Sequence, residues 1–168
     1  TNTQTYTGDS NTLIGNNING TDTINYSKVT AVGMNIKQID SDSVLIGNDA
    51  YCTGTSNVCI GVSSGATRDS VSIGVWSEAG DKGVSIGTDN LCISEGTISI
   101  GYANIDENSD GDLDTTHTNA VVIGRESKAG LDSISIGAFI NTVASYAVSI
   151  GSNVTGATNA VSIGTDNS

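Results

Sequence analysis

The chain has 168 residues, a formal net charge of −12 and no proline, and only 4% of its residues are aromatic. So few large side chains argue against a globular core of the usual kind. The six Lys and Arg residues are scattered from Lys28 to Lys128, so there is no basic patch for nucleic acid, and no apolar run approaches the ~20 residues of a membrane helix. The chain also starts without a methionine or a signal segment, and we expect a fragment or a processed product.

A four-residue motif recurs along the chain: a β-branched residue, a mostly small residue, an aliphatic residue that is nearly always Ile, and Gly. Its glycines stand at positions 15, 33, 47, 61, 74, 87, 101, 124, 137, 151 and 164, and eight of the ten intervals are 13 or 14 residues. A fixed period of this kind indicates a solenoid of stacked coils. We therefore predict one all-β domain over residues 1–168, with about eleven coils of 13–14 residues each.

Each copy of the motif predicts one short strand that ends at the glycine. In the copy Val71, Ser72, Ile73, the two β-branched residues share one face and the small residue lies on the other. The small-residue column carries no charge in any copy, which indicates that its face is covered as well. We expect the coil's own second layer to cover one face and a neighbouring subunit the other, and the sequence leaves open which face does which.

Small residues also recur at the third and fifth places after the glycine, as in the pairs Ser64 and Ala66 or Ser77 and Ala79. They predict the inward positions of a second, narrower strand. Coils of this kind stack at ~4.8 Å, so eleven of them would make a rod roughly 50 Å long.

Two of the intervals are longer than the rest. The first, from Gly15 to Gly33, contains the turn-rich residues 19–23 and predicts a longer loop. The second, from Gly101 to Gly124, holds an insertion within residues 102–119 that reads Asp-x-Asn-x-Asp-Gly-x-x-Asp from Asp106.

The spacing of oxygen-bearing side chains in this insertion predicts a calcium site, because Ca²⁺ takes six to eight oxygen ligands. Asp106, Asn108, Asp110 and Asp114 are predicted to bind through their side-chain oxygens. Asp112 is predicted to bind through its backbone carbonyl. The pattern resembles calcium loops of the EF-hand, dockerin and integrin-propeller kinds. His117 stands where an EF-hand has its bidentate glutamate, so flanking helices are not expected, and a flexible acidic loop is the alternative.

Four aromatic residues outside the apolar columns are candidate contacts for a receptor, since exposed aromatic rings suit sugar or protein contact. They are Trp76, Phe139, Tyr51 and Tyr102. The alternative is that these rings cover the edge of the solenoid or a seam between subunits.

The three cysteines, Cys52, Cys59 and Cys92, occupy positions that hold small residues in other coils. We predict three small buried thiols, with a metal site or a disulfide as the alternative.

The copies at residues 69–74, 83–87 and 147–151, each followed by small residues, resemble the head repeats of YadA-like trimeric autotransporter adhesins. The resemblance implies a left-handed parallel β-roll, a homotrimer, and an extracellular fibre on a bacterial surface that attaches to a cell-surface protein or glycan. The motifs also resemble head-type repeats of bacteriophage tail fibres, which implies a place on a virion. Serine replaces the family's more usual alanine in the middle column, we expect no stalk or anchor within these residues, and an odd number of cysteines suits assembly in a reducing cytosol.

The sequence offers no catalytic set, because His117 is the single histidine and the serines recur as a column. We expect a structural or adhesive fibre segment rather than an enzyme; a segment that only supports recognition elsewhere is the main alternative. A polysaccharide depolymerase built on distant carboxylates is a minor one. An ice-binding surface needs threonines aligned coil after coil, which the local pairs of threonines here do not provide.

Overall fold

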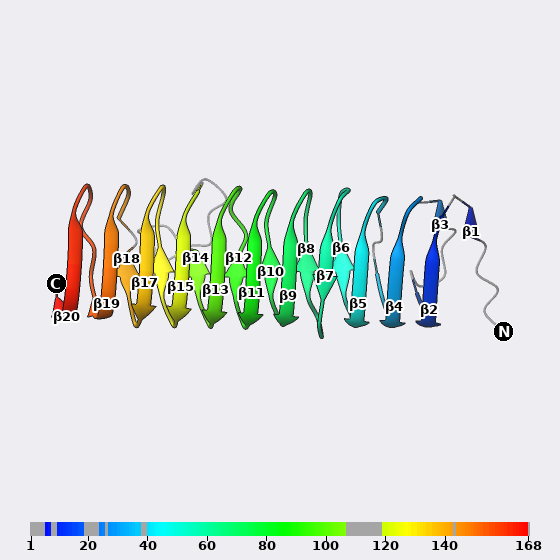
Figure 1. Ribbon diagram of the computed structural model, residues 1–168, viewed down its shortest axis with the longest axis horizontal. Helices are drawn as coiled ribbons and strands as arrows, with labels where there is room; N and C mark the ends of the chain where they lie inside the picture. The colour runs from blue at the N-terminus through cyan, green and yellow to red at the C-terminus, as the bar shows by residue number, and fades with distance from the viewer. Residues whose placement is uncertain are drawn as a thin grey trace.

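The computed structural model describes residues 6–7, 10–18, 24–25, 27–37, 40–106, 119–142 and 144–167. Within these ranges all regular elements are strands, and they stack along one axis as a parallel β-solenoid (Figure 1). The predicted all-β, coil-by-coil architecture is confirmed at this level. The described residues contain no helix that is long and apolar enough to cross a membrane.

Eleven strands form one long parallel sheet, each paired in register with the next. The repeat glycines sit opposite one another, as in the pair Gly74 and Gly87. In sheet order the strands are β2 (Thr12–Asn16), β4 (Thr30–Met34), β5 (Val44–Asn48), β7 (Val58–Ile60), β9 (Val71–Val75), β11 (Val84–Thr88), β13 (Ile98–Tyr102), β15 (Val121–Arg125), β17 (Ile134–Ala138), β19 (Val148–Val154) and β20 (Val161–Asn167).

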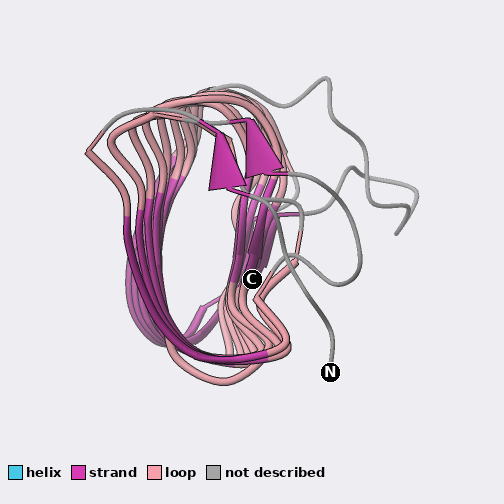
Figure 2. Ribbon diagram, turned by 90° about the vertical axis from the view of Figure 1, so that its right-hand side faces the viewer, coloured by secondary structure: helices cyan, strands magenta, loops and turns pink. Residues whose placement is uncertain are grey.

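A narrower sheet of two-residue strands lies across the coil from the long sheet, so that the end view is a flattened ring (Figure 2). Its seven strands are β6 (Tyr51–Cys52), β8 (Gly65–Ala66), β10 (Glu78–Ala79), β12 (Leu91–Cys92), β14 (Ile105–Asp106), β16 (Lys128–Ala129) and β18 (Asn141–Thr142). Near the N-terminal end, β1 (Tyr6–Thr7) pairs with β3 (Ile24–Asn25).

The register of both sheets passes across the long interval without a shift. Gly101 of β13 sits opposite Gly124 of β15, and Asp106 of β14 sits opposite Ala129 of β16. The stack of coils is therefore continuous on the two sides of the insertion, from β13 and β14 to β15 and β16.

The small-residue column of the long strands points into the solenoid. Leu45, Cys59, Ser72 and Ser85 are fully buried. The inward positions predicted for the second strand are confirmed too, since the third and fifth residues after the glycine, where their burial is described, are buried from Gly15 to Gly151, as at Ser64 and Ala66, and only Asn167 in the last coil is exposed. The interior is aliphatic around Ile36 and Leu45 near the N-terminal end and mostly polar further along the chain.

Many of the hydroxyl and amide groups in this narrow interior are hydrogen-bonded to one another or to the backbone, whereas four hydroxyls have no partner among the described residues, those of Thr97, Ser99, Thr142 and Ser149. The Ser64 hydroxyl donates to the Ser72 hydroxyl at 3.0 Å, so a single pair of serines spans the two layers. The Asn90 side-chain amide donates to the carbonyl of Ile86 at 2.8 Å, and its oxygen accepts from the backbone N–H of Asn104 at 3.1 Å. Buried polar groups cost stability unless they are paired, and these pairs explain why serine and asparagine are tolerated there.

Two turn positions in each coil adopt the left-handed conformation. One is the fifth residue before the repeat glycine, such as Asp69 (φ 56°), and the other is the second residue after it, such as Asp89 (φ 53°). Asn, Asp and Ser fill most of these places, in keeping with their tolerance for positive φ. These residues turn the chain between the two layers of every coil.

Candidate functional site

The outward face of the long sheet carries partly exposed aliphatic side chains, and we call it the ladder face. It consists of the β-branched residues at the first and third places of the motif, two from each long strand. In the central strands these residues are partly exposed, and Ile98, Ile100, Ile123, Ile134 and Ile136 are each 37% exposed. Apart from the threonines of β2 and β4, every position on this face is Val or Ile.

The structure thereby assigns the two faces that the sequence leaves open. The coil's own second layer covers the small residues, and the aliphatic ladder faces outward. The ladder therefore contributes little to the interior of a single chain, which is filled mostly by serine, alanine, asparagine and cysteine, with a few aliphatic residues such as Ile36, Leu45 and Ile140.

Three of the four aromatic candidates lie at the same edge of the long sheet. Tyr102 ends β13 and is 47% exposed, Trp76 directly follows β9 and is 63% exposed, and Phe139 directly follows β17 and is 44% exposed. Trp76 and Phe139 occupy the same left-handed turn position, with φ of 52° and 55°. Four steps of the sheet separate them, from β9 to β17, which corresponds to ~19 Å at the usual strand spacing.

The ring of Phe139 is covered by a cation from the preceding coil. The guanidinium carbon of Arg125 lies 4.6 Å from the ring centroid, a cation–π geometry. Arg125 is the last residue of β15, and its carbonyl accepts the backbone N–H of Phe139 at 2.9 Å. Part of the Phe139 ring is thus covered by a side chain of the same protein.

Tyr51 does not join the other three aromatics, because it begins β6 in the short sheet. Its ring lies against Gly65 of the next coil, where an added Cβ would come within 2.2 Å of the ring carbon Cζ. Burial, and then a hydrogen bond with the Glu78 carboxylate, raise the pKa of Tyr51 well above its ordinary value. Tyr51 is therefore packed into the edge of the solenoid, as the alternative reading of these rings expects.

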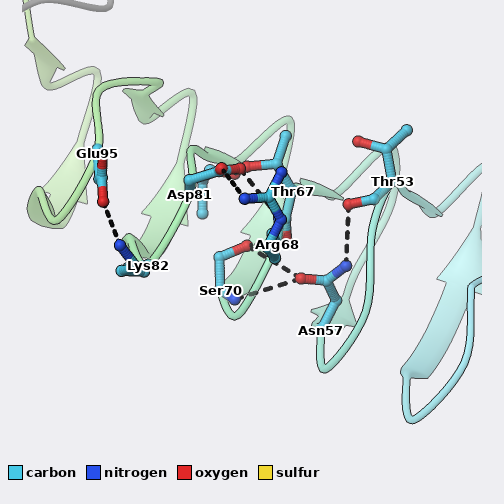
Figure 3. A network of polar contacts seen from close by, with 9 residues as sticks. Thr53, Asn57, Thr67, Arg68, Ser70, Asp81, Lys82 and Glu95 are labelled. Atoms are coloured by element: carbon cyan, nitrogen blue, oxygen red, sulfur yellow. Dashed lines mark hydrogen bonds and ion pairs between the residues drawn. The ribbon is translucent and has the colours of Figure 1, made fainter.

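A network of polar side chains links successive coils along one edge (Figure 3). Arg68 pairs with Asp81 of the next coil at 3.4 Å, and Lys82 pairs with Glu95 of the coil after that. The Asn57 side chain donates to the carbonyl of Thr53 at 3.2 Å and accepts from the next coil. Each exposed pair contributes little to the stability of the fold. Each of them joins two neighbouring coils in the same register as the strands.

The same edge contains a shallow hollow of about 350 Å³ lined by Thr67, Asp81, Ile93 and Glu95. A hydrogen bond from Thr67, then the backbone N–H and the charge of Arg68, hold the pKa of Asp81 below its ordinary value. A carboxylate held ionised by such partners is already satisfied and is a poor general acid or base at neutral pH. We therefore interpret the hollow as part of the edge between coils and not as a candidate catalytic site.

All three cysteines are fully buried thiols, as predicted. Cys52 and Cys59 face one another from the two layers, and the Cys59 thiol donates to the carbonyl of Tyr51 at 3.1 Å. Hydrogen bonding to Cys52, and then burial, raise the pKa of Cys59 far above its ordinary value. These thiols behave as small packing residues in the places where other coils carry serine or alanine.

The predicted calcium ligands lie almost wholly outside the described residues. Asp106 is described only as the second residue of β14, and Asn108, Asp110, Asp112 and Asp114 are beyond that part of the chain, as are residues 19–23 of the first long interval. Within the described ranges no group of three or more His, Cys, Asp or Glu side chains could hold a metal ion.

Sequence reasoning missed the left-handed turn columns and the Arg125–Phe139 contact. The signal for the columns is the preference for Asn, Asp and Ser at the second place after the glycine, from which Trp76 and Phe139 depart. The signal for the contact is the spacing of fourteen residues, one coil length, between Arg125 and Phe139. No protein-family model matches the chain, and neither does any curated protein sequence.

Proposed function

We propose that this chain is a segment of a homotrimeric, extracellular fibre that attaches a bacterial cell or a virion to a cell surface, and that it has no catalytic role. The observation that carries the proposal is the ladder face, an uncharged surface that runs along the long sheet and consists of Val and Ile, apart from one threonine in each of β2 and β4. Soluble monomers rarely expose continuous apolar surface on this scale, because its burial against a partner is favourable.

The best occupant of the ladder face is a second copy of the same chain. The strands that carry the face are stacked in one row along the solenoid axis (Figure 1). Its Val and Ile side chains therefore recur at every strand, ~4.8 Å apart. A partner must match this spacing through eleven strands, and another copy of the ladder does so at every level. No Lys, Arg, Asp or Glu interrupts the face to oppose such an association.

The finer features of the proposal rest on the resemblance of the motif to YadA-like and tail-fibre head repeats. These features are the left-handed winding, the number of eleven coils, and the presence of three chains rather than two. The resemblance also supports attachment as the activity, with a cell-surface protein or glycan as the receptor and either a bacterial surface or a virion as the location.

The proposal is tested by the mass and the adhesion of the purified full chain. Sedimentation equilibrium is expected to give three times the chain mass at micromolar concentration, because burial of the ladder face stabilises the assembly. Beads coated with the trimer are expected to adhere to host cells, while beads coated with an unrelated acidic protein do not. A stably folded monomer at all concentrations contradicts the assembly, and equal adhesion of the two bead types contradicts the attachment.

Calcium binding by the insertion remains part of the proposal. With Ca²⁺ bound to Asp106, Asn108, Asp110, Asp112 and Asp114, part of the negative charge of this segment would be offset and the segment would be held in place between β14 and β15.

Calorimetry is expected to give one calcium site per chain with a Kd below millimolar, and saturating Ca²⁺ at about 100 times the Kd should stabilise the fold by about 2.7 kcal/mol. The variant Asp110→Asn should lose most of this binding, whereas Asp132→Asn, on an exposed turn of the scaffold, should keep it. Equal titrations for both variants, or melting that chelator leaves unchanged, would contradict the site.

A further inference from the structure

Trp76 is the most conspicuous residue on the surface that the proposed assembly does not explain. It is the single tryptophan of the chain, and it lies in a turn just outside the ladder face. Its φ of 52° is unfavourable for a bulky residue, and most other coils place Asn, Asp or Ser there. Backbone strain that is retained at an exposed aromatic ring points to a functional contact.

Phe139 shows which side chain an aromatic ring at this turn position can bind. In both coils the aromatic residue donates its backbone N–H to the residue one coil before it, at 2.9 Å, so the two positions are equivalent. For Phe139 that residue is Arg125, which places its guanidinium over the ring. For Trp76 it is Val62, an exposed aliphatic side chain. The Trp76 ring therefore stands where this fold accommodates a cation, and the corresponding residue of the preceding coil, Val62, carries no charge.

The charge around Trp76 favours a cation as well. The next residue of the same turn column is Asp89, whose backbone N–H donates to the carbonyl of Val75, the residue before Trp76. Glu78 follows Trp76 by two residues, and the whole chain carries a net charge of −12. An acidic surface attracts basic partners over a Debye length, and indole is the best aromatic face for a cation.

We propose that Trp76 binds an arginine side chain of a basic protein segment on the surface to which the fibre attaches, with the guanidinium stacked on the indole. The arrangement reproduces in an intermolecular contact what Arg125 does for Phe139 within the chain. Arginine fits better than lysine, because its planar guanidinium stacks on aromatic rings. The inference rests on the proposed attachment function and names the chemistry of its partner.

The test uses the full chain and a fluorescein-labelled synthetic peptide of alternating glycine and arginine, at low salt. Binding is followed by the anisotropy of the label, and the Trp76 emission is expected to change with the same midpoint. The variant Trp76→Ala carries the same charge, so a difference from the parent isolates the ring. We expect it to bind the peptide about two- to fivefold more weakly.

Two variants serve as matched controls. Phe139→Ala removes a ring that already has its own cation, and it should leave the peptide affinity unchanged. Val62→Arg places an internal guanidinium next to Trp76, as Arg125 stands next to Phe139, and it should weaken peptide binding about two- to fivefold while changing the Trp76 emission without peptide.

Unchanged affinity in Trp76→Ala overturns the inference, as does equal weakening in Phe139→Ala. Saturable binding of a neutral oligosaccharide at Trp76, without peptide binding, also overturns it and assigns the ring to a glycan. Resistance of Trp76 to acrylamide quenching would place the ring in a subunit seam and overturn it too. The mass of each sample is measured in parallel: a monomer that keeps Trp76-dependent peptide binding contradicts only the proposed assembly, whereas a trimer without it contradicts only this inference.

Discussion

The variant Ile100→Lys is expected to abolish the trimer while each chain stays folded. Ile100 lies in the middle of the ladder face on β13, outward and 37% exposed in the single chain. A lysine there meets water in the monomer, so the solenoid tolerates it. In the trimer, three ammonium groups at one level would be removed from water next to one another, at a cost of several kcal/mol per ion. We expect the association to weaken at least a hundredfold.

Sedimentation and circular dichroism measure the two parts of this prediction separately. The matched control is Asn159→Lys, which adds the same charge at an exposed turn outside the ladder face, in the column where Lys28 and Lys82 already stand, and it should leave the mass of a trimer. Beads coated with Ile100→Lys should adhere less than beads coated with the parent protein. A trimer binds a surface through several sites at once, which raises its overall affinity above that of a single chain. An intact trimer of Ile100→Lys would place the seam on another surface.

The arrangement of the coils could be predicted from the sequence because several signals agree at each copy of the motif. The glycine, the alternation around Ser72 and the small residues Ser64 and Ala66 each indicate the same strand, turn and second strand, and the structure has all of them. The period then extends the result to coils whose signals are weaker, such as the one that contains Ala31 and Val32. Agreement among local signals is what makes a repeat predictable.

The direction of the ladder could not be predicted, because both faces of each strand lack charge. Alternation tells which residues share a face, and a shift by one residue would exchange the faces without changing the pattern. Inside the solenoid Ser72 meets Ser64 across a narrow space, which has no room for two rows of isoleucine. The size of the second-layer residues decides the direction, and it enters only when the two layers are placed together.

The aromatic residues of the candidate site could be predicted from the sequence, but their contacts could not. Trp76 and Phe139 stand out by residue type and by their equal distance from a glycine. That Tyr51 lies in the other sheet against Gly65, and that Arg125 covers Phe139, depends on contacts between neighbouring coils. Such contacts join residues a coil length apart, and the sequence pattern does not weigh them.

The variant Gly74→Ala is expected to cause a severe loss of stability, as are the equivalent changes at other repeat glycines such as Gly124. Gly74 has a φ of +139°, and a Cβ added there would lie 1.6 Å from the carbonyl oxygen of Gly87 in the next strand. That oxygen belongs to the backbone ladder, so it cannot move without breaking the pairing of β9 and β11. Clash and strain together place the expected loss at about 4–5 kcal/mol or more, in the range reserved for severe mutations.

Gly164→Ala provides a matched control at the end of the same column. Gly164 has nearly the same φ, +141°, but an added Cβ there meets nothing within 4 Å. Only the backbone strain remains, so we expect a loss of about 1–3 kcal/mol. Urea unfolding followed by circular dichroism measures both variants, and the difference between them isolates the contact with the neighbouring strand. Equal losses at Gly74 and Gly164 would mean that conformation alone, rather than the close stacking of coils, requires glycine at the turn.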